Sequence, residues 1–261
     1  MHANSKSSNA DHQVIILAAG RSLRLESLTR TRPKCLLTVE NQPILGHTLN
    51  NLSERGFRRL TLVVGYMREK IIETFGDRFE GIDIEYVINE NYAETERGFS
   101  LYCAKSSWIK RRNPVVFIDA DNFFEPAMLD RLMECAFRDV VLVDEDLDTT
   151  SRDEELVRGR EGVVSGLYRG RGADYPDCVG GFVGVNRFSS EFMSMLFNHM
   201  DQRFPDDICT RTYEHIFDSL IKERGWQLNY LQTKGLPWIN VNQESDYAIA
   251  KEIARRMKNE K

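Results

Sequence analysis

Short apolar runs alternate along the chain with segments whose apolar residues recur every three or four positions. The short runs predict buried strands at 14–17, 60–64, 114–118 and 140–143. The periodic segments predict helices at 43–55, 67–75, 100–110 and 126–137. Because strands that alternate with helices build βαβ units, the pattern predicts an α/β fold with a Rossmann-like, doubly wound, mostly parallel sheet between two layers of helices.

The pattern becomes less regular after residue 144, where a crowd of acidic residues interrupts the apolar positions. Beyond it the sequence predicts a hairpin around Gly162, strands at 182–185 and 228–231, helices at 190–200 and 210–224, and a terminal helix from about Glu244. We interpret residues 1–12 as a flexible N-terminal tail and residues 13–258 as one domain.

The composition limits which kinds of binding partner we expect for this chain. The 261 residues carry a formal net charge of -5, which argues against general affinity for nucleic acid. The five cysteines show no CxxC or metal-ligand spacing, which favours a reducing, cytoplasmic location over a disulfide framework. No apolar run of 18 residues is present, so a membrane is not an expected partner either. The oligomeric state stays open, with a homodimer among the alternatives.

The predicted strand at 14–17 runs directly into a loop of small residues and cations. Ala18, Ala19 and Gly20 leave the backbone N–H groups open to close approach by a polyphosphate. Five cations follow within one loop, namely Arg21, Arg24, Arg30, Arg32 and Lys34. Oriented donors and dense positive charge together predict a site for a nucleoside triphosphate.

This stretch resembles the signature of a nucleotidyltransferase family that includes the sugar-phosphate nucleotidyltransferases. The matching positions are Leu17 to Gly20 for LAAG, Arg24 for the signature arginine, and Pro33, Lys34 and Leu36 for PKxL. Ser22 stands where the second glycine of the signature is usual, and its Cβ restricts the path of the backbone. The resemblance extends over nearly the whole chain and implies a three-layer α/β/α fold of the nucleotide-diphospho-sugar transferase, GT-A-like type.

The resemblance also implies roles for individual residues. Arg24 and Lys34 would be catalytic, because they would stabilise charge on the α-phosphate and on the leaving pyrophosphate. The stretch RGFSLY at 97–102 is similar to one in phosphocholine cytidylyltransferases, in a region that lines the base and ribose. The implied nucleotide-binding residues are Leu17, Ala18, Ala19, Gly20, Arg21, Ser22, Asn89, Gly98 and Ser100. For Ser100, a helix N-cap is the alternative.

Two oxygen-bearing side chains from distant segments are candidates for a metal site. The predicted strand at 114–118 leads into Asp119 and Asp121, and a carboxylate there is well placed to hold a Mg²⁺ that bridges phosphates. The resemblance assigns the metal to Asp121 and, through the WINVN segment, to Asn242. Asp119 is then a structural acid that accepts from loop N–H groups, although the residues alone leave the reverse assignment open.

The resemblance places an acceptor-binding subregion at about 144–235. Arg169 takes the place of a lysine that holds the acceptor phosphate, and Trp238 is the second predicted acceptor contact. The acidic residues at 144–155 form either a solvated loop or a site for a substrate amine. Four aromatic residues leave two alternatives open: they form an aromatic cage for an ammonium group, or they belong to the ordinary core. These residues are Trp238, Tyr92, Tyr168 and Phe182.

These features predict a Mg²⁺-dependent nucleotidyltransferase. Its resemblances favour a cytidylyltransferase that joins CTP to a small acceptor, such as phosphocholine or 2-aminoethylphosphonate, and releases pyrophosphate. The alternative is a sugar-1-phosphate nucleotidyltransferase that uses UTP, dTTP or GTP. A third hypothesis, from a different class, is a nucleotide-sensing module that binds without transfer; Ser22 in the loop and the neutral Asn242 motivate it.

Overall fold

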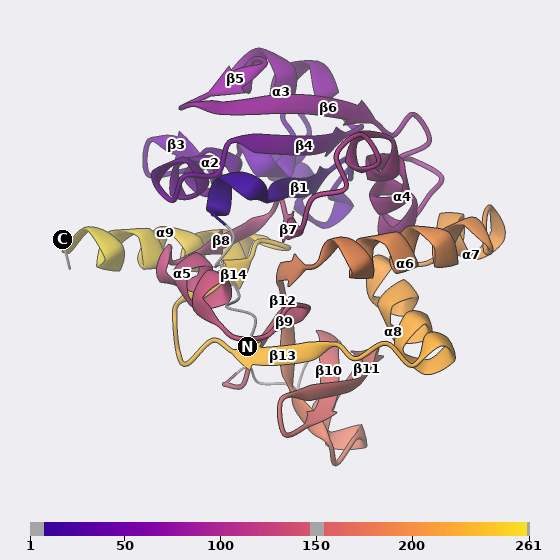
Figure 1. Cartoon of the computed structure of the whole chain (residues 1–261). Helices are drawn as coiled ribbons and strands as arrows, with labels where there is room; N and C mark the ends of the chain where they lie inside the picture. Colours follow the sequence, from indigo (N-terminus) through magenta and orange to yellow (C-terminus); the bar gives the residue numbers. More distant parts are fainter. Residues whose placement is uncertain (1–7, 147–153, 260–261) are drawn as a thin grey trace.

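The computed structural model describes residues 8–146 and 154–259, and within these ranges a ten-stranded sheet forms the centre of the molecule (Figure 1). In sheet order its strands are β10 (Glu154–Arg160), β11 (Val163–Gly170), β13 (Asn229–Gln232), β9 (Val140–Asp144), β12 (Cys178–Phe188), β7 (Val115–Asp119), β1 (Gln13–Ala18), β4 (Arg59–Val64), β6 (Ile82–Ile88) and β5 (Arg78–Phe79). Short ladders join β2 (Thr38–Val39) to β3 (Gln42–Pro43) and β8 (Asn122–Phe124) to β14 (Trp238–Asn240).

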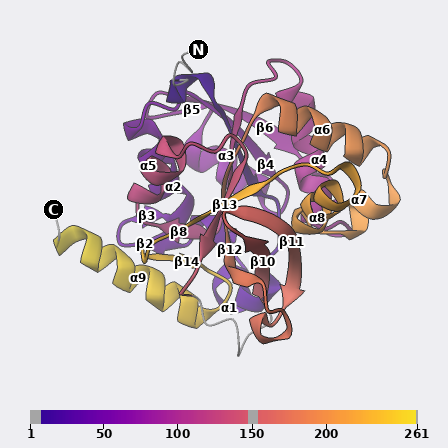
Figure 2. The ribbon, with the colours of Figure 1, turned by 60° about the horizontal axis from the view of Figure 1, so that its bottom comes forward.

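Helices cover both faces of this sheet. They are α1 (Glu26–Thr29), α2 (Ile44–Glu54), α3 (Arg68–Phe75), α4 (Arg97–Trp108), α5 (Ala127–Glu134), α6 (Ser190–Asp201), α7 (Asp206–Thr210), α8 (Tyr213–Arg224) and α9 (Glu244–Asn259). Helices α2, α3 and α5 pack into one core cluster, and α4, α6 and α8 pack into the cluster on the opposite face. Helix α9 lies along one side beside β2 and β14 (Figure 2). No described helix is both long and apolar enough to cross a membrane.

Strand β1 lies at the centre of the parallel half of the sheet. It pairs in parallel with β4 on one side and with β7 on the other. Val14 and Ile16 point into one core cluster and Ile15 into the other, and all three side chains are fully buried. Burial on both faces accounts for the unbroken apolar run in the sequence. The parallel arrangement brings the carboxyl ends of β1 and β7 to the same edge of the sheet.

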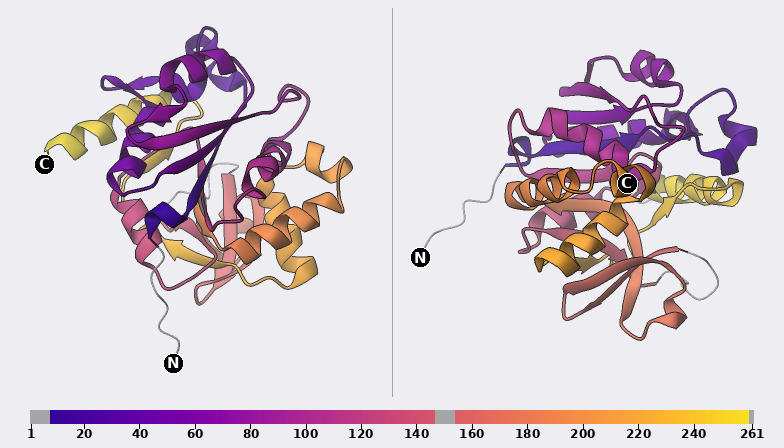
Figure 3. Two further views of the ribbon diagram at one scale, coloured as in Figure 1. Left: turned by 45° about the horizontal axis from the view of Figure 1, so that its top comes forward. Right: turned by 90° about the vertical axis from the view of Figure 1, so that its right-hand side faces the viewer.

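The second half of the sheet is mixed rather than parallel. Strand β12 runs antiparallel to both β7 and β9, whereas β13 and β9 are parallel to each other. The hairpin β10–β11 forms around Gly162, as the sequence predicts, and extends away from the parallel strands (Figure 3). The α/β fold with a Rossmann-like parallel half is therefore confirmed, with an antiparallel extension that the βαβ pattern does not contain.

Several element boundaries differ from the sequence-based prediction. Helix α4 starts at Arg97, three residues before the predicted start, because Gly98 allows close packing against the Arg211 carbonyl. The predicted helix at 210–224 begins three residues later, as α8, and the short helix α7 that precedes it was not predicted. Residues 1–7 of the predicted tail lie outside the described residues, whereas Asn9 is held in place by a 2.8 Å hydrogen bond from its Nδ2 to the Arg55 carbonyl. Ordered structure thus begins before residue 13.

Gly184 fixes how closely β12 approaches the end of β7. The register of β12 against β9 shifts between Phe182 and Asn186, and Gly184 within this stretch has a φ of +77°. A Cβ on Gly184 would lie 2.5 Å from Asp119 Oδ2 and 3.0 Å from Asn122 Nδ2. Both the positive φ and the lack of space require glycine at this position.

We predict that Gly184→Ala lowers the free energy of unfolding by about 3 kcal/mol or more, because it adds a steric clash to backbone strain. Gly225→Ala is the matched control: Gly225 has a φ of +62°, but an added Cβ would meet no heavy atom within 4 Å. That control should lose only about 1 kcal/mol. Urea unfolding followed by circular dichroism measures both values, and equal losses would contradict the close approach.

Candidate active site

A pocket opens at the carboxyl ends of β1 and β7. Its lining residues are Leu17, Ala18, Ala19, Gly20, Ser22, Pro33, Lys34, Cys35, Arg97, Ser100, Asp119, Ala120 and Asp121. The lining therefore includes most of the loop that the sequence predicts to bind nucleotide, together with one predicted catalytic residue and one predicted metal ligand. Burial raises the pKa of the Cys35 thiol to about 12, so this thiol stays protonated and is a poor nucleophile.

The backbone after β1 is open to a ligand at Gly20. A Cβ built on Gly20 would meet no heavy atom within 4 Å, so space remains in front of the peptide. Ser22 has a φ of +54°, in the left-handed region that glycine adopts freely and serine adopts at a cost of about 1 kcal/mol. The loop thus keeps a glycine-like path although its second glycine is replaced. Arg21 is exposed outside the lining, with its guanidinium 5.9 Å from the centre of the Tyr66 ring.

Four predicted site residues from three distant segments contact one another, and two of them, Lys34 and Asp121, line the pocket. The Lys34 ammonium forms an ion pair with Asp121 Oδ2 and donates to Asn242 Oδ1 at 3.1 Å. The Arg24 guanidinium donates to the same Asn242 oxygen, also at 3.1 Å. Their convergence places two cations and two oxygen ligands of the predicted site in direct contact.

Asp246 positions Asn242, and sequence reasoning missed it. Its carboxylate accepts from the backbone N–H groups of Asn242 and Gln243, each at 2.9 Å, at the start of α9. The side chain is buried, with 3% of its surface exposed. An acid in the first turn of a helix is an ordinary capping signal, and this one also orients the segment that carries Asn242.

The oxygens around Lys34 fit a divalent cation that arrives with phosphates. Asp121 supplies a charged carboxylate oxygen and Asn242 a neutral amide oxygen, and both already surround one positive charge, the Lys34 ammonium. Mg²⁺ accepts one or two protein oxygens together with substrate phosphates and waters. Within residues 8–146 and 154–259, no group of three or more His, Cys, Asp or Glu side chains could hold a metal ion by itself.

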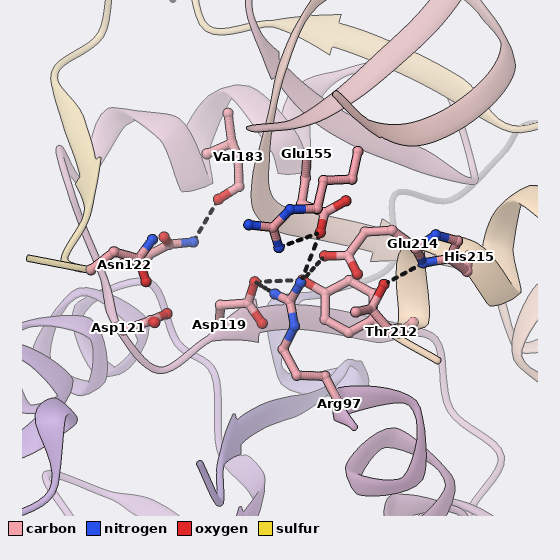
Figure 4. Close-up of polar contacts among 12 residues, drawn as sticks. Arg97, Asp119, Asp121, Asn122, Glu155, Val183, Thr212, Glu214 and His215 are labelled. Atoms are coloured by element: carbon pink, nitrogen blue, oxygen red, sulfur yellow. Dashed lines mark hydrogen bonds and ion pairs between the residues drawn. The ribbon is translucent and has the colours of Figure 1, made fainter. Parts of the chain in front are cut away.

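Arg97 lies at the centre of a buried acidic cluster beside the pocket (Figure 4), which sequence reasoning did not predict. Its guanidinium lies 3.0 Å from Glu214 Oε1, 3.4 Å from Glu155 Oε1 and 3.8 Å from Asp119 Oδ2. It also lies 5.0 Å from the centre of the Tyr213 ring. We use the name acidic cluster for Asp119, Glu155 and Glu214.

Asp119 belongs to this cluster and not to the group around Lys34. Its Oδ2 accepts from the Tyr213 hydroxyl and faces Arg97, whereas Asp121 faces Lys34. Burial is the main cause that raises the pKa of Asp119 to about 7. The nearby Arg97 guanidinium lowers this pKa, whereas the carboxylates of Asp121 and Glu214 raise it. Among the described residues, no loop N–H group donates to Asp119 as predicted; its contacts there are to the Tyr213 hydroxyl and the Arg97 guanidinium.

Three predicted nucleotide-binding residues differ in their position relative to the pocket. Ser100 lines the pocket inside α4, so the alternative of a helix N-cap is wrong. Asn89 is buried behind it and donates from Nδ2 to Ser100 Oγ at 3.0 Å. Gly98 lies outside the lining, and a Cβ there would come within 2.5 Å of the Arg211 carbonyl oxygen. Close packing of α4 therefore explains the glycine at 98 without a contact to the base.

The two predicted acceptor residues also lie outside the pocket lining. Arg169 reaches Glu155 of the acidic cluster, with 3.7 Å between Nη1 and Oε1. Trp238 packs against the core, and its indole N–H donates to Asp144 Oδ2 at 2.8 Å. Phe182 packs on the opposite face of the sheet from Trp238, so the predicted aromatic cage is wrong.

The predicted solvated acidic loop is wrong at Glu155. Residues 147–153 of this segment lie outside the described residues. Glu155 lies in strand β10, with only 16% of its side chain exposed, and turns inward to Arg97. Glu155 is therefore part of the site region, whereas the nearby Asp146 is exposed to solvent.

Known proteins with similar sequences include nucleotidyltransferases. The chain is 37% identical over 120 residues to CMP-5'-(3-aminopropyl)phosphonate synthase of Streptomyces rubellomurinus, a match that covers 46% of this chain and 19% of that protein. It is 40% identical over 74 residues to the UTP--glucose-1-phosphate uridylyltransferase of Haloferax volcanii, which covers 28% of this chain and 30% of that protein. The matches thus span less than a third of either relative.

A solved structure matches over nearly the full length. The CTP:phosphocholine cytidylyltransferase from Streptococcus pneumoniae superposes with a TM-score of 0.69 at 23% identity, covering 93% of this chain and 98% of that one. This likeness confirms the fold. The family model of the MobA-like NTP transferase domain matches residues 14–152, which is more than half of the sequence. The chain therefore belongs to the MobA-like NTP transferase family.

Proposed function

We propose that this protein is a Mg²⁺-dependent cytidylyltransferase, which joins CTP to a small phosphate or phosphonate acceptor and releases pyrophosphate. The observation that carries the proposal is the mutual contact of Arg24, Lys34, Asp121 and Asn242 beside the pocket that Lys34 and Asp121 line. Cations that stabilise a polyphosphate and oxygens that suit its metal ion are the parts that nucleotidyl transfer requires.

The proposed reaction is an in-line displacement at the α-phosphorus. An oxygen of the acceptor attacks this phosphorus, and the bond to the bridging oxygen of the β-phosphate breaks. The electron pair of that bond leaves with pyrophosphate. Because a phosphate oxygen is already largely ionised at neutral pH, the protein needs no general base to activate the nucleophile.

The residues around Lys34 would supply positioning and charge. Lys34 and Arg24 would donate to the α-phosphate and to the leaving pyrophosphate, where negative charge develops. Asp121 and Asn242 would hold Mg²⁺, which neutralises phosphate charge when it is bound. Asp246 would keep Asn242 in place through its two backbone contacts.

The relatives support CTP and a phosphonate-like acceptor. One of them is a synthase whose named product carries CMP on an aminopropylphosphonate, and the superposed structure is a phosphocholine cytidylyltransferase. The uridylyltransferase relative keeps a second candidate open, in which a sugar 1-phosphate reacts with UTP, dTTP or GTP. The third hypothesis is a nucleotide-sensing module. Such a module would bind the nucleotide through the same loop but would not catalyse metal-assisted transfer.

We predict that Lys34→Ala lowers the rate of pyrophosphate release roughly 100-fold or more, because one preorganised charge is lost from the site. Lys258→Ala is the control, since Lys258 forms only a surface ion pair with Glu40 at 2.5 Å. A coupled phosphate assay measures both variants, and thermal unfolding confirms that each is folded. Full activity in Lys34→Ala would contradict the assignment of the site.

Substrate choice gives a further prediction. With CTP, UTP, dTTP and GTP each offered with phosphocholine, 2-aminoethylphosphonate or glucose 1-phosphate, pyrophosphate release should be fastest with CTP and an amine-bearing acceptor. Removal of Mg²⁺ with EDTA should abolish the release, because the phosphate charge is no longer neutralised. Fastest release from UTP or dTTP with the sugar phosphate would overturn the cytidylyl assignment. Nucleotide binding without release under any condition would favour the sensing module.

A further inference from the structure

We propose that Asn89 is a positioning residue for base recognition, because it turns the Ser100 hydroxyl so that its proton, and not a lone pair, faces the pocket. This inference rests on the proposed function and deepens it, since it states how the site distinguishes one base from another. A hydroxyl turned in this way would donate to N3 of cytosine, which is an acceptor. At the same position uracil and thymine carry an N–H donor, which this hydroxyl could not satisfy.

The orientation of the Asn89 amide is fixed by its own partners. Asn89 is 1% exposed and directly follows β6. Its Oδ1 accepts from the Asn91 backbone N–H at 2.9 Å, so the amide oxygen faces Asn91. Its Nδ2 then donates to the hydroxyl oxygens of Thr95 and Ser100, at 3.3 Å and 3.0 Å. The Thr95 hydroxyl donates to the Asn91 carbonyl at 2.9 Å and is therefore an acceptor toward Asn89. These contacts agree that Asn89 is the donor to Ser100.

The Ser100 hydroxyl is left with a proton to donate. Its Oγ accepts from Asn89, but the hydroxyl donates to no group among the described residues. In another helix the Thr74 hydroxyl donates to the Lys70 carbonyl one turn earlier, at 2.6 Å, and Ser100 makes no such bond in α4. Ser100 is 6% exposed and lines the pocket. When a ligand displaces water from the pocket, this proton needs an acceptor on the ligand.

The position of Ser100 suits the base rather than the phosphates. The pocket reaches both faces of the sheet at the end of β1: Cys35 belongs to one core cluster, and Leu17 belongs to the other, together with the apolar residues of α4. Lys34 lies beside Cys35 in the chain, and Ser100 lies in α4. A triphosphate held at Lys34 would leave the part of the pocket beside α4 for the nucleoside. There Leu17 offers apolar surface to the base ring, and Ser100 offers a polar group to its edge.

The competing interpretation is that Asn89 only holds the loop after β6 in shape. A substitution would then weaken the binding of every nucleotide alike. The variant Asn89→Asp separates the two interpretations because it keeps the shape of the side chain. One carboxylate oxygen can still accept from the Asn91 N–H, whereas the other can only accept from the Ser100 hydroxyl. Ser100 Oγ would then present a lone pair to the base, which suits N3–H of uracil and opposes N3 of cytosine.

The test measures the affinities of CTP and UTP by calorimetric titration with Mg²⁺ and without any acceptor. Wild-type protein should bind CTP at least about tenfold more tightly than UTP, the scale of one buried hydrogen bond. In Ser100→Ala this ratio should fall about tenfold. In Asn89→Asp, titrated at about pH 8.5 to ionise the new carboxyl group, it should fall about 100-fold, because one bond is lost with CTP and one is gained with UTP.

Ser106→Ala is the matched control. Ser106 belongs to the same helix, α4, but it is exposed, and its Oγ donates to the Cys103 carbonyl at 3.0 Å. It does not line the pocket. This variant should leave the ratio of the two affinities unchanged.

Each outcome decides the proposal. Equal losses of affinity for CTP and UTP in Asn89→Asp would mean that Asn89 only shapes the loop, and would overturn it. An unchanged ratio in Ser100→Ala would overturn it as well, because Ser100 would not contact the base. Titration needs no transfer, so the proposed function fails separately, if no acceptor gives pyrophosphate release.

A second probe keeps the proposal testable if Asn89→Asp fails to fold. In 3-deaza-CTP a carbon atom replaces N3, so the acceptor is missing and the rest of the nucleotide is unchanged. Wild-type protein should bind CTP about tenfold more tightly than this analogue, and Ser100→Ala should bind both equally. Equal affinities in the wild-type protein would contradict a hydrogen bond from Ser100 to N3.

Discussion

The contact of the Lys34 ammonium with Asp121 and Asn242 is the interaction on which the site depends. It joins the loop after β1, the end of β7 and the segment before α9, three segments that are far apart in the sequence. The parallel pairing of β1 with β7 brings the first two together, and Asp246 at the start of α9 fixes the third. The fold thus supplies what the chemistry requires, which is cations and oxygen ligands held around one point before substrate arrives.

The electrostatic character of the pocket changes across a short distance. Lys34 lines one part of the pocket, with Arg24 close by, and Arg97 and Asp119 line another part, with Glu155 and Glu214 behind them. Asp119 and Asp121 are only two residues apart but face different partners: Asp119 contacts Tyr213 and Arg97, and Asp121 faces Lys34.

Much of the site could be predicted because its parts are local in sequence. The loop from Leu17 to Lys34 is contiguous, and the rule that parallel strands end at one edge places Asp121 beside it. Asn242 needed the family resemblance. The acidic cluster escaped prediction because Glu214 resembles an ordinary acid in the first turn of a helix, and Glu155 lies beside a stretch of acids that suggests a solvated loop. Only the tertiary packing of α8 and β10 around Arg97 reveals them.

The most direct test of the central claim is the position of a metal ion in a crystal of the protein grown with Mn²⁺ and a non-hydrolysable CTP analogue. The account predicts an anomalous scattering peak between Asp121 and Asn242, with the α- and β-phosphates bound at the same ion and Lys34 donating to them. A triphosphate bound elsewhere, or a metal ion held by Asp119 with Asp121 still paired to Lys34, would contradict it.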